Sequence, residues 1–165
     1  MTPLSIKLFT VVFIFNGGKV LLLKRSKAKK FLPGKIVGIG GHVEPGETAD
    51  LLSSALREVE EETKVKREDL YDFKYLGVLS FSNYHELEGH TYFFSAEIKD
   101  IKDLDLSCPD GELNLYPVRQ LPKLNFCADT KKAVPYLLKA KSSGKIFRGN
   151  YIFNRRRNYF SYLME

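Results

Sequence analysis

The chain has 165 residues, of which 44% are hydrophobic and 28% charged, and this length allows one domain with a buried core, which we expect over residues 1–165. Two cysteines exclude a disulfide-rich scaffold and favour reduced thiols, so we expect a cytoplasmic protein. The formal net charge of +6 suits an anionic ligand but is too small to indicate nucleic acid as a partner.

The N-terminal segment predicts a β-hairpin. Residues 5–15 and 19–24 are apolar and β-branched, and Asn16-Gly17-Gly18 stands between them as a turn. The apolar run at residues 8–15 is too short to span a bilayer, so no membrane partner is expected.

A loop, a strand and a helix follow the hairpin. Residues 26–35 form a basic loop that ends in Pro-Gly, and residues 36–39 form a short strand that leads into a glycine turn. Residues 48–63 predict a helix, with Thr48 as its N-cap.

The second half of the chain predicts mainly strands and one more helix. Pro135 lies inside that helix and implies a kink. The expected elements are strands at 71–82 and 91–98 joined by a loop at 83–90, an irregular acidic stretch at 100–110, a strand at 112–118, a helix at 129–141, and a closing hairpin of 146–153 and 159–163 with its turn at 154–158.

Strands mixed with two well-separated helices favour an α/β fold. Each helix needs a sheet face on which to bury its apolar side. The sequence therefore predicts a sandwich in which helices cover both faces of a mixed sheet.

The first helix carries glutamates on one face and apolar residues on the other. Glu58, Glu61 and Glu62 fall within an arc of about 100°. Such a face is most often only solvated, and clustered like charges destabilise a bare helix. A divalent cation would reverse that effect, and oxygen-only ligands suit Mg²⁺ or Mn²⁺. The opposite stripe consists of Leu51, Leu52, Ala55, Leu56 and Val59.

Residues 41–65 resemble the Nudix box, Gly-x5-Glu-x7-Arg-Glu-U-x-Glu-Glu-x-Gly-U, in which U is a bulky aliphatic residue. Gly41 and Glu47 fit the first half of that signature, and Arg57 begins the second half. The resemblance implies the Nudix fold, an α/β/α sandwich with a mixed β-sheet, whose element order matches the chain from about residue 5.

The resemblance also implies a site and a chemistry. Glu58, Glu61 and Glu62 would bind Mg²⁺ or Mn²⁺, and one of them would serve as general base. A backbone carbonyl of Gly40 or Gly41 would complete the metal site. Two further roles are implied: Arg57 would hold the glutamates in place, and Glu112 would add an acid from a later loop. A plain surface role for Glu112 is the alternative.

The box departs from the signature at two places. Nine residues separate Glu47 from Arg57, where the signature has seven, and a longer loop before the helix would absorb the extra pair. Lys64 stands where glycine is usual, which changes the turn after the helix.

The substrate is expected to be a small nucleotide. Lys24 and Arg25, at the start of the basic loop, are candidate contacts for a triphosphate, with a solvated loop as the alternative. Residues 121–129, 134–138 and 145–151 resemble the MutT-related 8-oxo-dGTP diphosphatases, in which an aspartate at the place of Asp129 reads the oxidised purine. Unlike many members of that subgroup, the chain has Ile36 and Val37 before the box glycines and contains no tryptophan.

The leading interpretation is a nucleoside triphosphate pyrophosphohydrolase that works as a monomer or homodimer. ADP-ribose, a dinucleoside polyphosphate or a capped RNA end are alternative substrates, because the enzymes that act on them share the box. A nucleotide-binding module that has lost turnover is a further alternative, favoured by the longer box and by Lys64.

Overall fold

The computed structural model describes residues 5–84, 87–157 and 159–165, which form a mixed sheet flanked by two α-helices. The helices are α1 (Leu51–Thr63) and α2 (Ala128–Ser143), and two 3₁₀ turns are η1 (Arg67–Asp69) and η2 (Val118–Lys123). The strands are β1 (Ile6–Asn16), β2 (Lys19–Arg25), β3 (Ile36–Val37), β4 (Ile39–His42), β5 (Leu70–Tyr84), β6 (Leu87–Ile98), β7 (Ser107–Cys108), β8 (Gly111–Pro117), β9 (Phe147–Asn154) and β10 (Tyr159–Met164).

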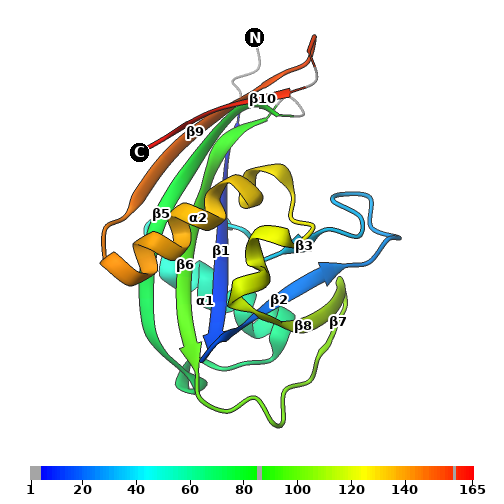
Figure 1. Ribbon diagram of the computed structural model, residues 1–165, viewed down its shortest axis with the longest axis vertical. Coiled ribbons are helices and arrows are strands. Elements are labelled where there is room, and N and C mark those ends of the chain that lie inside the picture. The colour runs from blue at the N-terminus through cyan, green and yellow to red at the C-terminus, as the bar shows by residue number, and fades with distance from the viewer. Residues whose placement is uncertain (1–4, 85–86, 158) are drawn as a thin grey trace.

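The strand order of the sheet is β10-β9-β5-β6-β1-β2-β8-β7 (Figure 1). Strand β1 lies in its interior and pairs with three other strands, β2, β4 and β6. It pairs antiparallel with β2 and parallel with β6, and β5 pairs parallel with β9. Strand β4 pairs antiparallel with residues 9–12 in the middle of β1, which brings the glycine turn to the middle of the sheet. The mixed sheet and both predicted hairpins are confirmed.

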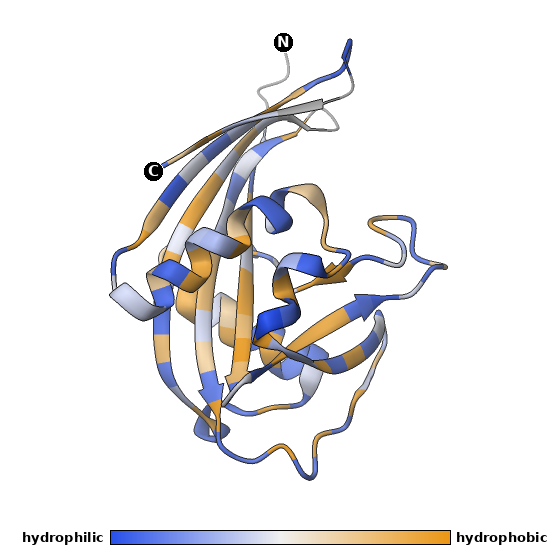
Figure 2. Cartoon of the chain, viewed as in Figure 1, coloured by the Kyte–Doolittle hydropathy of each residue, from blue (hydrophilic) through white to orange (hydrophobic). Residues whose placement is uncertain are grey.

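The two faces of the sheet carry separate apolar cores, because successive residues of a strand point to opposite faces. Phe13 of β1 belongs to the core that α2 covers, and its neighbour Ile14 belongs to the core under α1. Ala55 and Val59 of α1 are fully buried, as is Leu137 of α2. The strands are therefore largely apolar (Figure 2), and one helix covers each face of the sheet. The predicted α/β/α sandwich is confirmed.

Helix α1 begins three residues later than its predicted start. Asp50 is its N-cap and accepts a hydrogen bond from Ser53 N at 3.0 Å, so the prediction of Thr48 as N-cap was wrong. The residues before Asp50 form turns, as shown by Glu47 N donating to Glu44 O and Asp50 N to Glu47 O. The two extra residues of the box therefore lie in this turn and leave the helix unchanged.

The predicted loop at 83–90 was mostly wrong. Strand β5 continues to Tyr84 and β6 begins at Leu87, while residues 85 and 86 lie outside the described residues. The polar side chains of this stretch suggested a loop, but polar residues within a sheet can form hydrogen bonds with one another. Ser80 Oγ and His90 Nδ1, for example, lie 2.7 Å apart.

Helix α2 extends beyond its predicted range at both ends and contains Pro135 without ending there. The predicted acidic stretch at 100–110 includes the short strand β7. The turn of the C-terminal hairpin was predicted at 154–158, and residue 158 lies outside the described residues. No helix among the described residues is both long enough and apolar enough to cross a membrane.

Candidate active site

The glycine turn of β4 lies directly against the acidic face of α1. A Cβ atom on Gly41 would lie 2.8 Å from the carboxylate atoms of Glu58, closer than side chains approach one another. The backbone N–H of Gly40 donates to Glu62 Oε2 at 3.1 Å. Gly41 therefore leaves room for one carboxylate, and Gly40 fixes a second one.

Arg57 joins the loop before the helix to the acidic face. Its Nε and one terminal nitrogen bind the two carboxylate oxygens of Glu47 at 2.7 and 3.1 Å. Its other terminal nitrogen lies 2.9 Å from Glu58 Oε1 and 3.0 Å from Glu61 Oε2. The carbonyl of His42 accepts a further bond at 3.0 Å. Arg57 thus sets the position of three acidic side chains and of the glycine turn, as its expected holding role requires.

The carboxylates differ strongly in their electrostatic surroundings. The bonds from Arg57 hold the pKa of Glu47 down at about 2. Burial raises the pKa of Glu62 to about 8, although the Gly40 N–H opposes that rise. Burial also raises the pKa of Glu58, with Arg57 acting in the opposite direction. Partly buried carboxylates with raised pKa values lack sufficient compensating charge, so a cation beside Glu58 and Glu62 would stabilise their ionised forms.

The donor set fits a hard divalent cation, but the side chains are not gathered around one point. In the part of the chain that the structure describes, no three His, Cys, Asp or Glu side chains are grouped closely enough to hold a metal ion. Arg57 accounts for this, because it binds Glu61, whose side chain is 57% exposed, and one oxygen of Glu58. Carboxylate oxygens suit Mg²⁺ or Mn²⁺. Glu58 and Glu62 offer carboxylate oxygens for such an ion, and Glu61, which shares a nitrogen of Arg57 with Glu58, would have to turn towards them.

The Nudix-domain family model matches residues 7–137 of the chain. The chain belongs to the Nudix family. It is a Nudix hydrolase, a member of a class of enzymes that act on phosphoric anhydride bonds.

Three solved structures show the same fold at low sequence identity. The MutT protein of Bacillus halodurans is 19% identical, with a TM-score of 0.72 over 97% of this chain and 98% of that one. An Ap4A hydrolase of C. elegans is 19% identical, with a TM-score of 0.60 over 85% of this chain and 100% of that one. The Nudix domain of Shewanella oneidensis NrtR, solved with ADP-ribose, is 15% identical, with a TM-score of 0.64 over 84% and 89%.

Arg25 and Lys24, the last residues of β2, point to opposite faces of the Nudix sheet. The charge of Arg25 favours ionisation of Glu62, which places it on the α1 face, and its Nε donates to Phe31 O at 2.9 Å. Lys24 follows the buried Leu23 of the α1 core and therefore lies on the α2 face. Of the two predicted phosphate contacts, the structure brings only Arg25 towards the carboxylates.

Glu112 is not brought together with the carboxylates of the Nudix box. It pairs with Lys24 in the register of β2 and β8 and shares the α2 face with Tyr116. Burial, and to a lesser degree the charge of Glu112, raises the pKa of Tyr116. Asp110, two residues earlier in the turn between β7 and β8, contributes instead to the raised pKa of Glu62. Asp110 was not predicted as a site residue, although it stands in a tight turn beside a core strand.

Asp129 lies in the first turn of α2 and thus on the face of the sheet opposite to the box helix. It contacts the thiol of Cys127, whose pKa rises to about 12, chiefly because of burial. The structure therefore places the proposed base-reading residue across the sheet from the proposed metal ligands.

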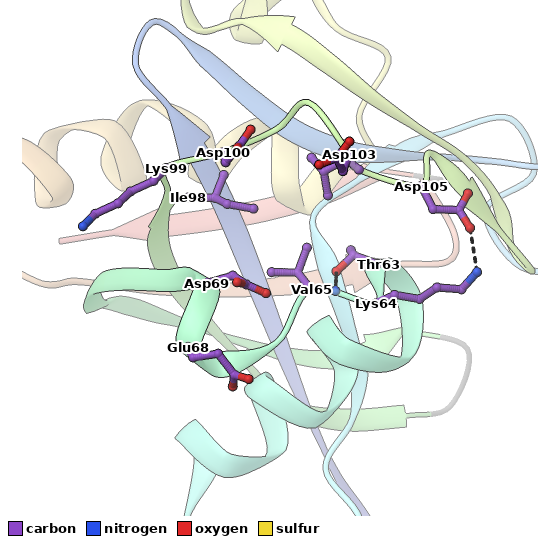
Figure 3. Close-up of a pocket in the computed structure, with 11 residues that line it drawn as sticks. Thr63, Lys64, Val65, Glu68, Asp69, Ile98, Lys99, Asp100, Asp103 and Asp105 are labelled. Atoms are coloured by element: carbon purple, nitrogen blue, oxygen red, sulfur yellow. Dashed lines mark hydrogen bonds and ion pairs between the residues drawn. The ribbon is translucent and has the colours of Figure 1, made fainter.

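A cavity of about 550 Å³ lies at the C-terminal end of α1 (Figure 3). Neither Glu58 nor Gly41 is among the residues that line it. Lys64 adopts a left-handed conformation there, with φ of 61°, and its Nζ binds Asp105 Oδ2 at 2.6 Å. Lys64 thus takes the backbone conformation that glycine usually supplies in this position, and its ion pair ties the helix end to the loop after β6. The substitution of the box glycine changes this turn and not the carboxylates.

Proposed function

We propose that the chain is a Mg²⁺-dependent nucleoside triphosphate pyrophosphohydrolase, consisting of one Nudix domain over residues 1–165. Water would attack a phosphorus of the triphosphate, the anhydride bond to the leaving phosphates would break, and a nucleoside monophosphate and pyrophosphate would be released. The observation that carries this proposal is the packing of Glu58 and Glu62 against the glycine turn, with Arg57 holding the acidic face.

Each residue of the site has a defined part in this proposal. Glu58 and Glu62 would bind Mg²⁺ or Mn²⁺, joined by Glu61 and by the carbonyl of Gly41. When bound, such an ion neutralises phosphate oxygens and lowers the pKa of a coordinated water. Arg57 keeps Glu58 and Glu61 oriented, since one of its terminal nitrogens contacts both.

The raised pKa of Glu62 fits the role of a general base. A carboxylate in water is too weakly basic to take a proton efficiently near neutral pH, whereas a buried one is better matched to that task. Phosphoryl transfer otherwise depends mainly on positioning and on compensation of charge. Arg25 supports that compensation, since its guanidinium lies on the same face as Glu62.

We propose oxidised purine nucleotides as the first substrates to test. The MutT protein of Bacillus halodurans shares the fold over nearly the whole chain. The sequence resemblance to the 8-oxo-dGTP diphosphatases would make Asp129 the base-reading residue. We also propose a cytoplasmic location, which the two free thiols support. For the oligomeric state, we propose a monomer or homodimer.

The test is a panel of nucleotides incubated with Mg²⁺ and scored for pyrophosphate against orthophosphate. The panel contains dGTP, 8-oxo-dGTP, ATP, ADP-ribose and diadenosine tetraphosphate. Pyrophosphate released from a triphosphate supports the proposal. Turnover of only ADP-ribose or diadenosine tetraphosphate would show that nucleoside triphosphates are not the substrates. No turnover of any compound would favour a binding module.

A further inference from the structure

The turn between β7 and β8 is fastened to the basic loop that follows β2. The backbone oxygen of Asp110 accepts a hydrogen bond from Ser26 N at 2.9 Å. Its carboxylate forms an ion pair with Lys29 Nζ, three residues further along the loop. One residue of the turn therefore holds the basic loop at two points.

The same turn lies very close to the end of β2. Gly111 pairs with Arg25, and a Cβ atom on this glycine would lie 2.0 Å from the backbone oxygen of Lys24. Only glycine allows the two backbones to approach in this way. The position of Asp110 relative to Lys24 and Arg25 is therefore fixed by the main chain and not only by the exposed ion pair.

A pocket of about 310 Å³ opens where the turn meets the loop. It is lined by Lys24, Arg25, Ser26, Lys27, Gly111 and Glu112. Among the described residues, none of the three cations in this lining forms an ion pair. The volume is at the lower end of ligand pockets, so the site suits a few phosphate groups and not a whole nucleotide.

Asp110 would oppose an anion in this pocket if its charge were not compensated. Lys29 supplies that compensation. The lining then holds the three cations Lys24, Arg25 and Lys27 against the one carboxylate of Glu112, which leaves a surplus of positive charge. The two side chains of the pair are 37% and 35% exposed, and exposed ion pairs contribute little to the stability of a fold. The contact is therefore expected to matter for the conformation of the loop and the local charge, with little effect on global unfolding.

We propose that Asp110 is a positioning residue, which with Lys29 holds the basic loop in the conformation that binds the outer phosphates of a nucleotide polyphosphate. This inference rests on the proposed function, because it assigns these phosphates to a pocket beside the proposed metal site. Lys24 would also contact these phosphates, because it lines the same pocket as Arg25 although it lies on the other face of the sheet from Glu62.

The test measures the binding of sodium tripolyphosphate by calorimetry, with EDTA present. Asp110→Asn is expected to weaken binding about tenfold through loss of a charge-assisted contact, and Lys29→Met to weaken it more, since the Asp110 charge is then uncompensated. The double variant should bind no worse than Lys29→Met, because the two residues act as a pair. Lys29→Arg should retain affinity, and Lys30→Met, a neighbouring exposed lysine, is the matched control.

Additive losses in the double variant, unchanged affinity in both single variants, or no binding by the wild-type protein would overturn the proposal. Melting temperatures within about 2 °C of the wild type exclude unfolding as the cause. With a substrate that is turned over, Asp110→Asn should raise KM and leave kcat within about twofold. Binding without metal does not depend on turnover, so an inactive wild-type protein would refute the proposed function without deciding the role of Asp110.

Discussion

Arg57 binds both carboxylate oxygens of Glu47, ten residues before it, at 2.7 and 3.1 Å. The pair closes the turn at residues 44–50 onto helix α1, and it does so although the box is two residues longer than the family signature. Two nitrogens of the guanidinium are thereby engaged, and only one remains for Glu58 and Glu61. Glu47 therefore limits how strongly Arg57 competes with a metal ion for the acidic face.

Glu47→Gln is expected to raise the Mg²⁺ concentration needed for half-maximal activity by about tenfold, because Arg57 then turns further onto Glu58 and Glu61. Activity measured against Mg²⁺ concentration checks this. Glu44→Gln is the matched control, since Glu44 is 63% exposed and lies 4.0 Å from Arg57. Equal Mg²⁺ requirements in the two variants would remove the restraining role of Glu47.

The spacing of the box was sufficient to locate the acidic face and the arginine beside it. Offsets of three and four residues determine which side chains share a helix face, so the sequence predicts that Glu58, Glu61 and Glu62 lie together. That a glycine carbonyl lies beside them was implied only by the resemblance to the Nudix box. The resemblance also implied that a carbonyl of Gly40 or Gly41 binds the metal, which stays a prediction. It gave no sign that the Gly40 N–H donates a hydrogen bond to Glu62.

Local spacing could not determine the contributions of other strands. Glu112 and Asp110 are two residues apart, and only the register of β8 with β2 shows that Glu112 lies on the α2 face. The N-cap was missed for a similar reason. Thr48 and Asp50 both suit that position, and the choice depends on the turn that Glu47 and Arg57 close.

Glu61→Gln is expected to lower turnover about tenfold or more while the protein stays folded, because the variant loses a proposed metal ligand and an Arg57 contact. Steady-state kinetics and circular dichroism check the two parts. Glu60→Gln, the preceding exposed residue of α1, is the control and should turn over normally. Wild-type turnover in Glu61→Gln would leave Glu61 without a metal role.

The raised pKa of Glu62 predicts a pH-dependent stability of the metal-free protein. Its folded-state pKa is about 8 against an ordinary 4.5, so between these values the folded state holds a proton that the unfolded state has lost. The free energy of unfolding should therefore be highest below pH 4.5, as far as Glu62 is concerned, and fall as the pH rises towards 8.

Denaturant unfolding in EDTA at several pH values measures this fall. Glu62→Gln should flatten the dependence, because its amide oxygen keeps the Gly40 bond without titrating. Saturating Mg²⁺ should have a similar effect in the wild-type protein, since it stabilises the ionised carboxylate. An identical pH dependence in Glu62→Gln and wild type would show that Glu62 titrates normally.

Asp129→Ala is expected to change nucleotide preference more than metal dependence, because Asp129 lies at the start of α2, on the opposite face from the box helix. The measurement is the ratio of kcat/KM for 8-oxo-dGTP and dGTP at fixed Mg²⁺. Cys127→Ser is the control for local disturbance, since that thiol contacts Asp129. A ratio within about twofold of wild type would contradict a base-reading role.

A crystal soaked in MnCl₂ tests the central claim most directly. Anomalous difference density is predicted between the carboxylates of Glu58 and Glu62, within coordination distance of both, with Arg57 still bound to Glu47. Saturating manganese with no density at that place, or with an ion held only by residues outside the box helix and the glycine turn, would contradict it.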